Sequence, residues 1–378
     1  MNRTVIDIHV LQTVPPSNIN RDDTGSPKTA TYGGVRRARV SSQAWKRATR
    51  VAFRDTLDKS ELGVRTKRVV ELLATEIAAR APELAEQAGT LATETFRAVG
   101  IDVKPPKKNG TDKTAVAEAG YLVFLSKRQI ENLAGAAIQA AGSSDVAKAL
   151  KIAKVKDLAD REHSVDVALF GRMVADQADI NVDAAAQVAH ALSVHAVETE
   201  FDYFTAVDDL NTEEETGAGM IGTIEFNSST LYRYATVDAN RLADNLGDVA
   251  ATRRAVEAFV EAFVRSMPAG KQTTFAHRTL PEAVIVQVRD RQPINLVGGF
   301  ENPVRELQRG GRIKAASETL RDEAHEIENN YAERPVAAWV TRVGEDTAAL
   351  DDLGTKVPFP QLVTELGTLV ATRFAEQP

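Results

Sequence analysis

The amino-acid sequence predicts an α+β fold in which a mostly helical block interrupts a β-containing domain. Three observations predict it. Apolar residues alternate near the N-terminus, the middle of the chain is alanine-rich and helical in pattern, and β-branched and aromatic residues return after residue 222. At 378 residues the chain is longer than one hydrophobic core usually organises. We therefore expect roughly two to three structural units.

The first predicted strand covers residues 4–13. Ile6 and Ile8 lie on one side of it and Asp7 and His9 on the other, which is the pattern of a strand with one buried face. A histidine on the polar side would be placed to act as an acid–base group in an RNA-cleaving enzyme. The alternative for His9 is a purely structural role.

A long loop, a short strand and a helix follow. Residues 15–34 are dense in Pro, Asn, Asp, Gly and Ser, and we expect no regular structure there. Loops of that length are uncommon inside compact domains and tend to be functional. Residues 35–40 predict a strand with Arg37 and Arg39 on one face. Ser42 is then placed to cap a helix that has an apolar face and a basic face.

This region holds a basic window, residues 27–50, with seven Lys or Arg and no acidic residue. The first 50 residues have a net charge of +6, whereas the whole chain has −7, so the remaining 328 residues sum to −13. A positive surface on a negative body predicts binding of a polyanion at a defined place. The alternative is a solvated helix beside a charged edge strand. The window consists of Lys28, Arg36, Arg37, Arg39, Lys46, Arg47 and Arg50.

The helical block extends from about residue 60 to residue 182. A capping box of Ser126 and Gln129 predicts the start of one of its helices. Strand patterns return at residues 222–237 and 283–288. A run of lysines in the block would suit a solubilising surface or contact with duplex DNA. These are Lys148, Lys151, Lys154 and Lys156.

Several functional classes are excluded or disfavoured. The chain has no cysteine, so disulfides, thiolate metal sites and a cysteine nucleophile are excluded. A GxGxxG run at residues 217–222 follows five carboxylates and leads into a strand pattern, so it does not predict a dinucleotide site. We expect neither a cofactor nor a metal. No apolar stretch of membrane-spanning length and no leader pattern occurs, which predicts a cytoplasmic protein without a membrane partner.

Three aromatic residues, Phe201, Tyr203 and Phe204, fall within four positions, although aromatics make up only 6% of the chain. On an exposed hairpin these rings would stack on bases or wedge between them. The alternative is an ordinary core or interface cluster.

Five segments, in this order along the chain, resemble the CasC-type backbone subunit of the Cascade complex in subtype I-E CRISPR systems. They lie between residues 6 and 235 of the sequence. The segments are IDIHVLQTVPPSNINRDD, TYGGVRRARVSSQAWKRATR, VDVALFGRM, HALSVHAVETEFDYFTAVDDL and EFNSSTLYRYA.

The resemblance implies an RRM-like (ferredoxin-like) palm, an inserted helical fingers domain and a thumb β-hairpin. It also implies copies that assemble head to tail along a CRISPR RNA, together with other Cascade subunits and target DNA. The expected boundaries are residues 1–59, 182–199 and 224–378 for the palm, 60–181 for the fingers and 200–223 for the thumb.

The resemblance further implies which residues bind RNA. A tryptophan is frequent in the family where Tyr203 stands here, so an aromatic face is kept. The lysines Lys148, Lys151 and Lys154 would contact DNA. The residues implied for RNA are Arg21, Lys28, Ser41, Gln43, Lys46 and Arg50 in the palm, Met173 beside the kinked RNA, Tyr203, Phe204 and Thr205 in the thumb, and Lys271 and Gln272 in a further palm segment.

The leading hypothesis from the sequence is a non-catalytic, guide-RNA-binding assembly protein that delegates sequence recognition to base pairing. The first alternative is a related RRM-like RNA endonuclease, with His9, or Asp22 and Asp23, near the scissile phosphate. The second alternative is a purely structural oligomer that binds no RNA.

Overall fold

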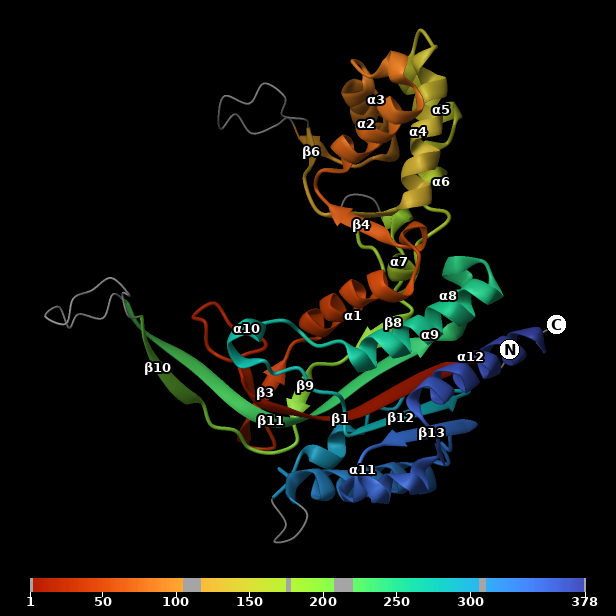
Figure 1. Cartoon of the computed structure of the whole chain (residues 1–378). Coiled ribbons are helices and arrows are strands. Elements are labelled where there is room, and N and C mark those ends of the chain that lie inside the picture. The colour runs from red at the N-terminus through yellow and green to blue at the C-terminus, as the bar shows by residue number, and fades with distance from the viewer. Residues whose placement is uncertain (1–2, 105–116, 175–177, 207–219, 306–310, 377–378) are drawn as a thin grey trace, which may run out of the picture. The chain divides into compact units, whose positions relative to one another are not determined.

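The computed structural model describes residues 3–104, 117–174, 178–206, 220–305 and 311–376, and the α+β class predicted from the sequence is confirmed (Figure 1). The chain forms two compact units, each from segments that lie far apart in sequence. Unit 1 consists of Met1–Ala52, Gln187–Asp238 and Val256–Pro378. Unit 2 consists of Phe53–Ala186 and Ala239–Ala255.

Unit 1 is built on a large sheet with ten strands among the described residues. Neighbours along the main path are antiparallel, except for β13 and β14 at one edge, which are parallel. Two further strands, β8 (Ala186–Val188) and β10 (Glu200–Ala206), pair with β11. The path runs β14 (Thr355–Lys356), β13 (Ala337–Arg342), β12 (Ala283–Arg289), β1 (Val5–Ser17), β11 (Met220–Asp238), β9 (Ala191–Ser193), β3 (Val35–Val40) and β2 (Thr29–Tyr32).

Strand β1 lies between β11 and β12, and both of its faces are buried. The sequence predicted one buried face because Asp7 and His9 alternate with apolar residues, and that prediction is wrong. Both side chains are at most 1% exposed. Asp7 pairs with Arg289 at 3.0 Å, and Nδ1 of His9 lies 2.9 Å from the Tyr232 hydroxyl. Buried partners therefore satisfy these polar groups, so neither needs to face water.

One face of the sheet is covered by a helical layer (Figure 1). Leu11, Tyr232 and Ile285 project from three adjacent strands into the same core as Leu320 of that layer. This burial of alternate strand residues gives the face its apolar character. The layer consists of α11 (Gly311–Tyr331) and the 3₁₀ helices η4 (Leu296–Phe300) and η5 (Glu345–Leu353).

A second core in unit 1 surrounds Trp45, which is 1% exposed. Val14 and Val40 pack against it, and the Phe263 ring meets the indole edge-on at 6.5 Å between centroids. The Arg233 guanidinium lies 3.7 Å from the indole centroid. The apolar face predicted for the first helix is therefore confirmed. The long helices on this core and beside it are α1 (Ser42–Thr56), α9 (Val249–Arg265) and α12 (Phe359–Ala375).

Two local predictions need correction. Residues 15–34 are not all irregular, because β1 extends past a bulge to Ser17 and β2 pairs with β3. The residue that caps α1 is Ser41 and not Ser42, since the Ser41 hydroxyl accepts the Ala44 amide at 3.3 Å. A helix that begins one residue earlier than its pattern suggests lies within the usual uncertainty of helix ends.

Unit 2 is mostly helical, with a core of its own. The predicted capping box is confirmed: the Ser126 hydroxyl accepts the Gln129 amide at 3.0 Å, and the Gln129 side chain accepts the Ser126 amide at 2.9 Å. Two small two-stranded antiparallel sheets pair β4 with β7 and β5 with β6. The helices are α2 (Val69–Arg80), α3 (Ala88–Val99), α4 (Lys127–Ala141), α5 (Val146–Ile152), α6 (Val155–Leu158), α7 (Val165–Phe170) and α8 (Ala239–Leu246), with η1 (Lys59–Glu61), η2 (Pro82–Leu84) and η3 (Ala178–Ile180). The strands are β4 (Gly63–Thr66), β5 (Val103–Lys104), β6 (Glu118–Ala119) and β7 (Val123–Ser126).

A helix that crosses a membrane must be both long and apolar. Within the ranges given above, no helix combines the length and the apolar character that are needed to cross a bilayer.

Candidate nucleic-acid interface

The loop between β1 and β2 is fastened to the start of α1 by Asn20. The Asn20 side-chain oxygen accepts the Ser41 amide at 2.8 Å, and its carbonyl accepts the Lys28 amide at 2.9 Å. Nearby, the Asn18 side chain donates to the Glu225 carbonyl at 2.9 Å. These bonds hold two of the predicted RNA-binding residues, Lys28 and Ser41, on one ordered piece of backbone.

The short helix α10 (Gln272–Phe275) is pressed against the same loop. A Cβ at Gly270 would lie 2.5 Å from the Ile19 carbonyl oxygen, so only glycine allows this approach. Lys271 and Ala276, at the two ends of α10, have φ angles of 52° and 46°. Left-handed backbone at non-glycine residues costs free energy and is kept only where the surroundings enforce it. The segment is therefore shaped for a particular placement of its side chains.

That placement forms an open hollow of about 980 Å³ in unit 1. Arg21 lines it together with Lys271 and Gln272, although some 250 residues separate them in sequence. The exposed Arg278 is a third cation there, and the sequence reasoning missed it because the resemblance implied only Lys271 and Gln272 in this part of the chain. The other lining residues are Ala269, Thr273 and Ala276. Three cations around one concave surface make a site for a polyanion.

Helix α1 presents its basic face opposite Trp45. Gln43 is exposed near the helix start, and Lys46 is half-buried. Burial lowers the pKa of the Lys46 ammonium. In the part of the chain that the structure describes, Lys46 forms no ion pair with a carboxylate. A partly desolvated cation without a counter-ion gains from an arriving phosphate. The structure places Arg50 one turn further along α1.

The basic window was expected to lie on the surface, but one of its members, Arg37, is buried. Its side chain is fully buried, and its guanidinium donates to four backbone carbonyls at 2.8–3.1 Å. Those acceptors are the carbonyls of Tyr32, Ser193, Phe300 and Glu301. Arg37 therefore stabilises β3 against η4 and is not available to a polyanion. Sequence counting could not separate it from its neighbours, because burial depends on which layer covers that face of the strand.

Strands β10 and β11 form the hairpin that was predicted for the aromatic cluster (Figure 1). Tyr203 is 63% exposed and Phe201 is 66% exposed, and both lie on the same face of β10 together with Thr205. Phe201 was named in the aromatic cluster but not among the expected RNA contacts. Exposed neighbouring rings of this kind mark a contact surface.

Phe204 lies on the opposite face of the hairpin from Tyr203. It pairs with Gly222, and its ring occupies the space that a side chain at residue 222 would need. At the base of the hairpin, the rings of Phe226 and Phe275 lie 5.8 Å apart and join β11 to α10. Residues 207–219, with the first half of the GxGxxG run, lie outside the described residues.

The remaining predicted residues belong to unit 2. Met173 is 82% exposed. Lys148 and Lys151 are exposed on α5, and Lys154 is exposed just before α6. Because these residues lie in unit 2, they form a separate set from the cations of unit 1.

Of the residues named for RNA cleavage, His9 and Asp22 are engaged in contacts within the fold. His9 is buried, and that burial is the main cause that lowers its pKa to about 3. The Asp22 carboxylate accepts the Thr24 hydroxyl at 2.7 Å and the Ser26 amide at 3.0 Å, which lowers the Asp22 pKa. A buried neutral imidazole and a carboxylate closed into a turn are poorly placed for proton transfer to a bound RNA.

The sequence and the structure of this chain were compared with those of known proteins. Residues 6–365 match the family described as CT1975-like protein. A solved chain described as "CRISPR RNA-guided surveillance complex, pre-nicking" is 33% identical, with a TM-score of 0.81 over 97% of this chain and 100% of that one. Another, described as "CRISPR RNA-guided surveillance complex", is 29% identical, with a TM-score of 0.70 over 97% and 99%. No curated protein sequence matches. Since the family match spans nearly the whole sequence, the chain belongs to the CT1975-like family of Cas proteins.

Proposed function

We propose that the protein is a non-catalytic backbone subunit of a type I-E Cascade surveillance complex and that it binds CRISPR RNA. The observation that carries the proposal is the hollow in unit 1, where Arg21, Lys271 and Arg278 surround one concave surface next to the β1–β2 loop, which Asn20 fastens to Lys28 and Ser41. The similarity to chains of RNA-guided surveillance complexes supports the nature of the polyanion.

The kinds of groups at the interface support a guide-RNA role. A subunit that must accept any guide sequence should bind phosphates and the faces of bases, and it should avoid reading base edges. Cations such as Lys46 suit phosphates, and the exposed rings of Phe201 and Tyr203 suit base faces. In this proposal the sheet of unit 1 is an RRM-like palm, the β10–β11 hairpin is the thumb and unit 2 is the fingers.

Several finer expectations from the resemblance remain part of this proposal. Further copies of the chain would assemble head to tail along the RNA, because a heterologous contact that does not close gives a filament. Other Cascade subunits and target DNA would be partners, with Lys148, Lys151 and Lys154 facing the DNA. We expect the complex to act in the cytoplasm.

The absence of catalysis is likewise proposed. The burial of His9 counts against the endonuclease alternative, and so do the hydrogen bonds that the Asp22 carboxylate accepts from Thr24 and Ser26 within its own turn. Incubation of the purified protein with repeat-containing RNA, with and without divalent metal, tests this. Specific cleavage would contradict the proposal.

The central experiment is co-expression of the chain with a CRISPR array, followed by sequencing of the RNA that co-purifies. We expect a high ratio of absorbance at 260 nm to that at 280 nm and an enrichment of array-derived RNA. A variant with Arg21 and Lys271 both changed to Ala should lose most of that RNA while keeping its fold. A low ratio for the unaltered protein would favour the purely structural oligomer.

A further inference from the structure

The three residues Gly171, Arg172 and Met173 have three different structural roles in unit 2. Gly171 ends α7 with a φ angle of 76°. Arg172 points into the unit and its side chain is 1% exposed. Met173, the next residue, is 82% exposed. This is the reverse of the usual pattern, in which arginine is exposed and methionine is buried.

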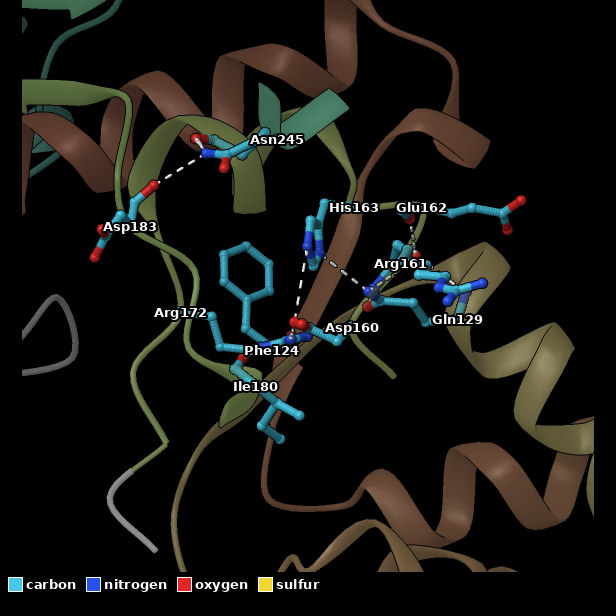
Figure 2. A network of polar contacts seen from close by, with 12 residues as sticks. Phe124, Gln129, Asp160, Arg161, Glu162, His163, Arg172, Ile180, Asp183 and Asn245 are labelled. Carbon is cyan, nitrogen blue, oxygen red and sulfur yellow. Dashed lines mark hydrogen bonds and ion pairs between the residues drawn. The ribbon is translucent and has the colours of Figure 1, made fainter. Parts of the chain in front are cut away.

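Arg172 is held by three different segments of unit 2 (Figure 2). Its Nε donates to the Ile180 carbonyl at 2.8 Å, and one Nη donates to the Asp160 carboxylate at 2.9 Å. The other Nη lies 3.4 Å from the Phe124 carbonyl. The planar guanidinium can serve all three acceptors at once, which a lysine ammonium at the end of a flexible chain does not reproduce.

The backbone around Arg172 is fixed as well. Arg172 and Val182 exchange two backbone hydrogen bonds of 3.0 and 2.8 Å. The Val174 amide donates to the Asn181 side chain at 2.6 Å. A Cβ at Gly171 would lie 2.8 Å from the Val182 carbonyl oxygen, so the close approach of the two segments requires glycine. Met173 therefore projects from a backbone that is bonded on both sides, at residues 172 and 174.

The contribution of the buried Arg172 to the free energy of folding does not by itself explain this arrangement. A buried guanidinium pays a large desolvation penalty, and burial lowers the pKa of Arg172 while it raises that of Asp160. Apolar residues of similar volume often replace such pairs with no loss of stability. A flexible methionine side chain, in contrast, reaches a defined place only if its backbone is fixed. The contacts of Arg172 thus have their clearest effect on the position of Met173.

We propose that Arg172 is a positioning residue, whose contacts with Ile180, Phe124 and Asp160 fix the backbone from which Met173 meets a base of the bound RNA. The inference rests on the proposed function, because it takes RNA as the partner of Met173. Arg172 itself is buried and does not touch the RNA.

A double-mutant cycle tests the inference, with R172Q, M173A and the combined variant in the full-length chain. M173A should weaken guide-RNA binding about five- to tenfold, because it removes an apolar contact with the base. R172Q should weaken it by a similar factor, and the combined variant should bind like M173A, because both changes remove the same interaction with the RNA. R80Q is the matched control in unit 2, since Arg80 pairs with Glu76 on a helix surface and should leave binding unchanged.

A second readout does not depend on RNA. Hydrogen exchange at the Val174 and Val182 amides should become faster in R172Q, whereas M173A should leave it unchanged. If R172Q does not fold, R172K takes its place in the cycle, because it keeps the charge but not the three-way contact. Independent, multiplicative losses in the combined variant would overturn the inference, as would faster exchange with unaltered RNA binding. If the unaltered protein binds no guide RNA, the proposed function itself falls, and the inference falls with it.

Discussion

Phe204 and Gly222 pair across the β10–β11 hairpin, and a Cβ at Gly222 would lie 2.4 Å from Cζ of Phe204. The ring therefore covers the glycine of the neighbouring strand, an arrangement that pins the register of a two-stranded hairpin. Tyr203, one residue earlier, points to the other face and is exposed. Two adjacent aromatics thus have different roles in the same strand.

This relationship predicts different effects for two alanine substitutions. Tyr203→Ala should leave the hairpin folded and weaken RNA binding by about 1–2 kcal/mol through the loss of base stacking. Phe204→Ala should expose the hairpin to limited proteolysis, because it removes the packing over Gly222. RNA titration and protease digestion of both variants check this. Equal protease resistance of Phe204→Ala and the unaltered chain would contradict the packing role.

The basic face of α1 predicts an effect that is the same for all guide sequences. Replacement of Lys46 or Arg50 with Ala should weaken binding uniformly and lower the slope of log K against log salt by about 0.7 for each phosphate that the protein no longer neutralises. Lys356→Ala on β14, at the opposite edge of the sheet from β2, is the control and should change neither. The measurement is a salt series with at least two unrelated guides, and an effect confined to one guide would count against a role in phosphate binding.

Arg278 lines the hollow but was not implied by the resemblance, and we expect it to bind RNA together with Lys271. Arg278→Ala should weaken RNA binding by a factor similar to that for Lys271→Ala, because both cations line the same surface. Arg291→Ala, at an exposed arginine of unit 1 that pairs with Glu333 at 3.6 Å, is a matched control. Competition binding with labelled guide RNA measures the three variants side by side. Normal affinity of Arg278→Ala would confine the site to Arg21 and Lys271.

Because Arg37 is buried, we expect its replacement to lower the stability of the fold and to leave the affinity for RNA unchanged. Arg37→Met should lower the free energy of unfolding by about 3 kcal/mol or more, because it leaves carbonyls without donors between β3 and η4. Arg36→Ala, at the exposed neighbouring position, should cost little. Thermal unfolding of the two variants decides between burial and surface roles. A larger effect of Arg36→Ala than of Arg37→Met would reverse the assignment.

The pH dependence of stability follows from two histidines, His9, which is buried, and His163, which is partly buried. Burial lowers the pKa of His163 to about 4 and that of His9 to about 3, from 6.5. Below pH 6.5 the unfolded chain therefore binds protons that the folded chain does not, and the free energy of unfolding falls as pH falls, by about 3 kcal/mol for His163. Asp160 acts in the opposite sense, since its raised pKa makes the folded state the one that binds the proton.

His163→Asn isolates this effect in unit 2. The variant should lose less stability than the unaltered chain between pH 7 and pH 4.5, as measured by thermal or urea unfolding. Identical pH profiles for the two proteins would mean that His163 is not the neutral, buried partner of Gln129 that its 3.1 Å contact indicates.

Periodicity and spacing were sufficient for local elements. The alternation in β1, the strand at residues 35–40, the amphipathic α1 and the capping box at Ser126 all depend on neighbours within a few residues, and the structure has each of them. The errors arose where a distant segment decides the outcome. Asp7 and His9 read as a solvent face because nothing local announces Arg289 and Tyr232 as their buried partners.

The sequence by itself determined the α+β class, the acid-free basic window, the resemblance to a Cas protein family and the set of side chains able to bind a polyanion. Only the tertiary structure decided which of them face outward together. It buried Arg37, brought Arg21 to Lys271 and Arg278, and turned Tyr203 away from Phe204. Charge and periodicity belong to the chain, whereas exposure and convergence depend on which faces the distant layers of the fold cover.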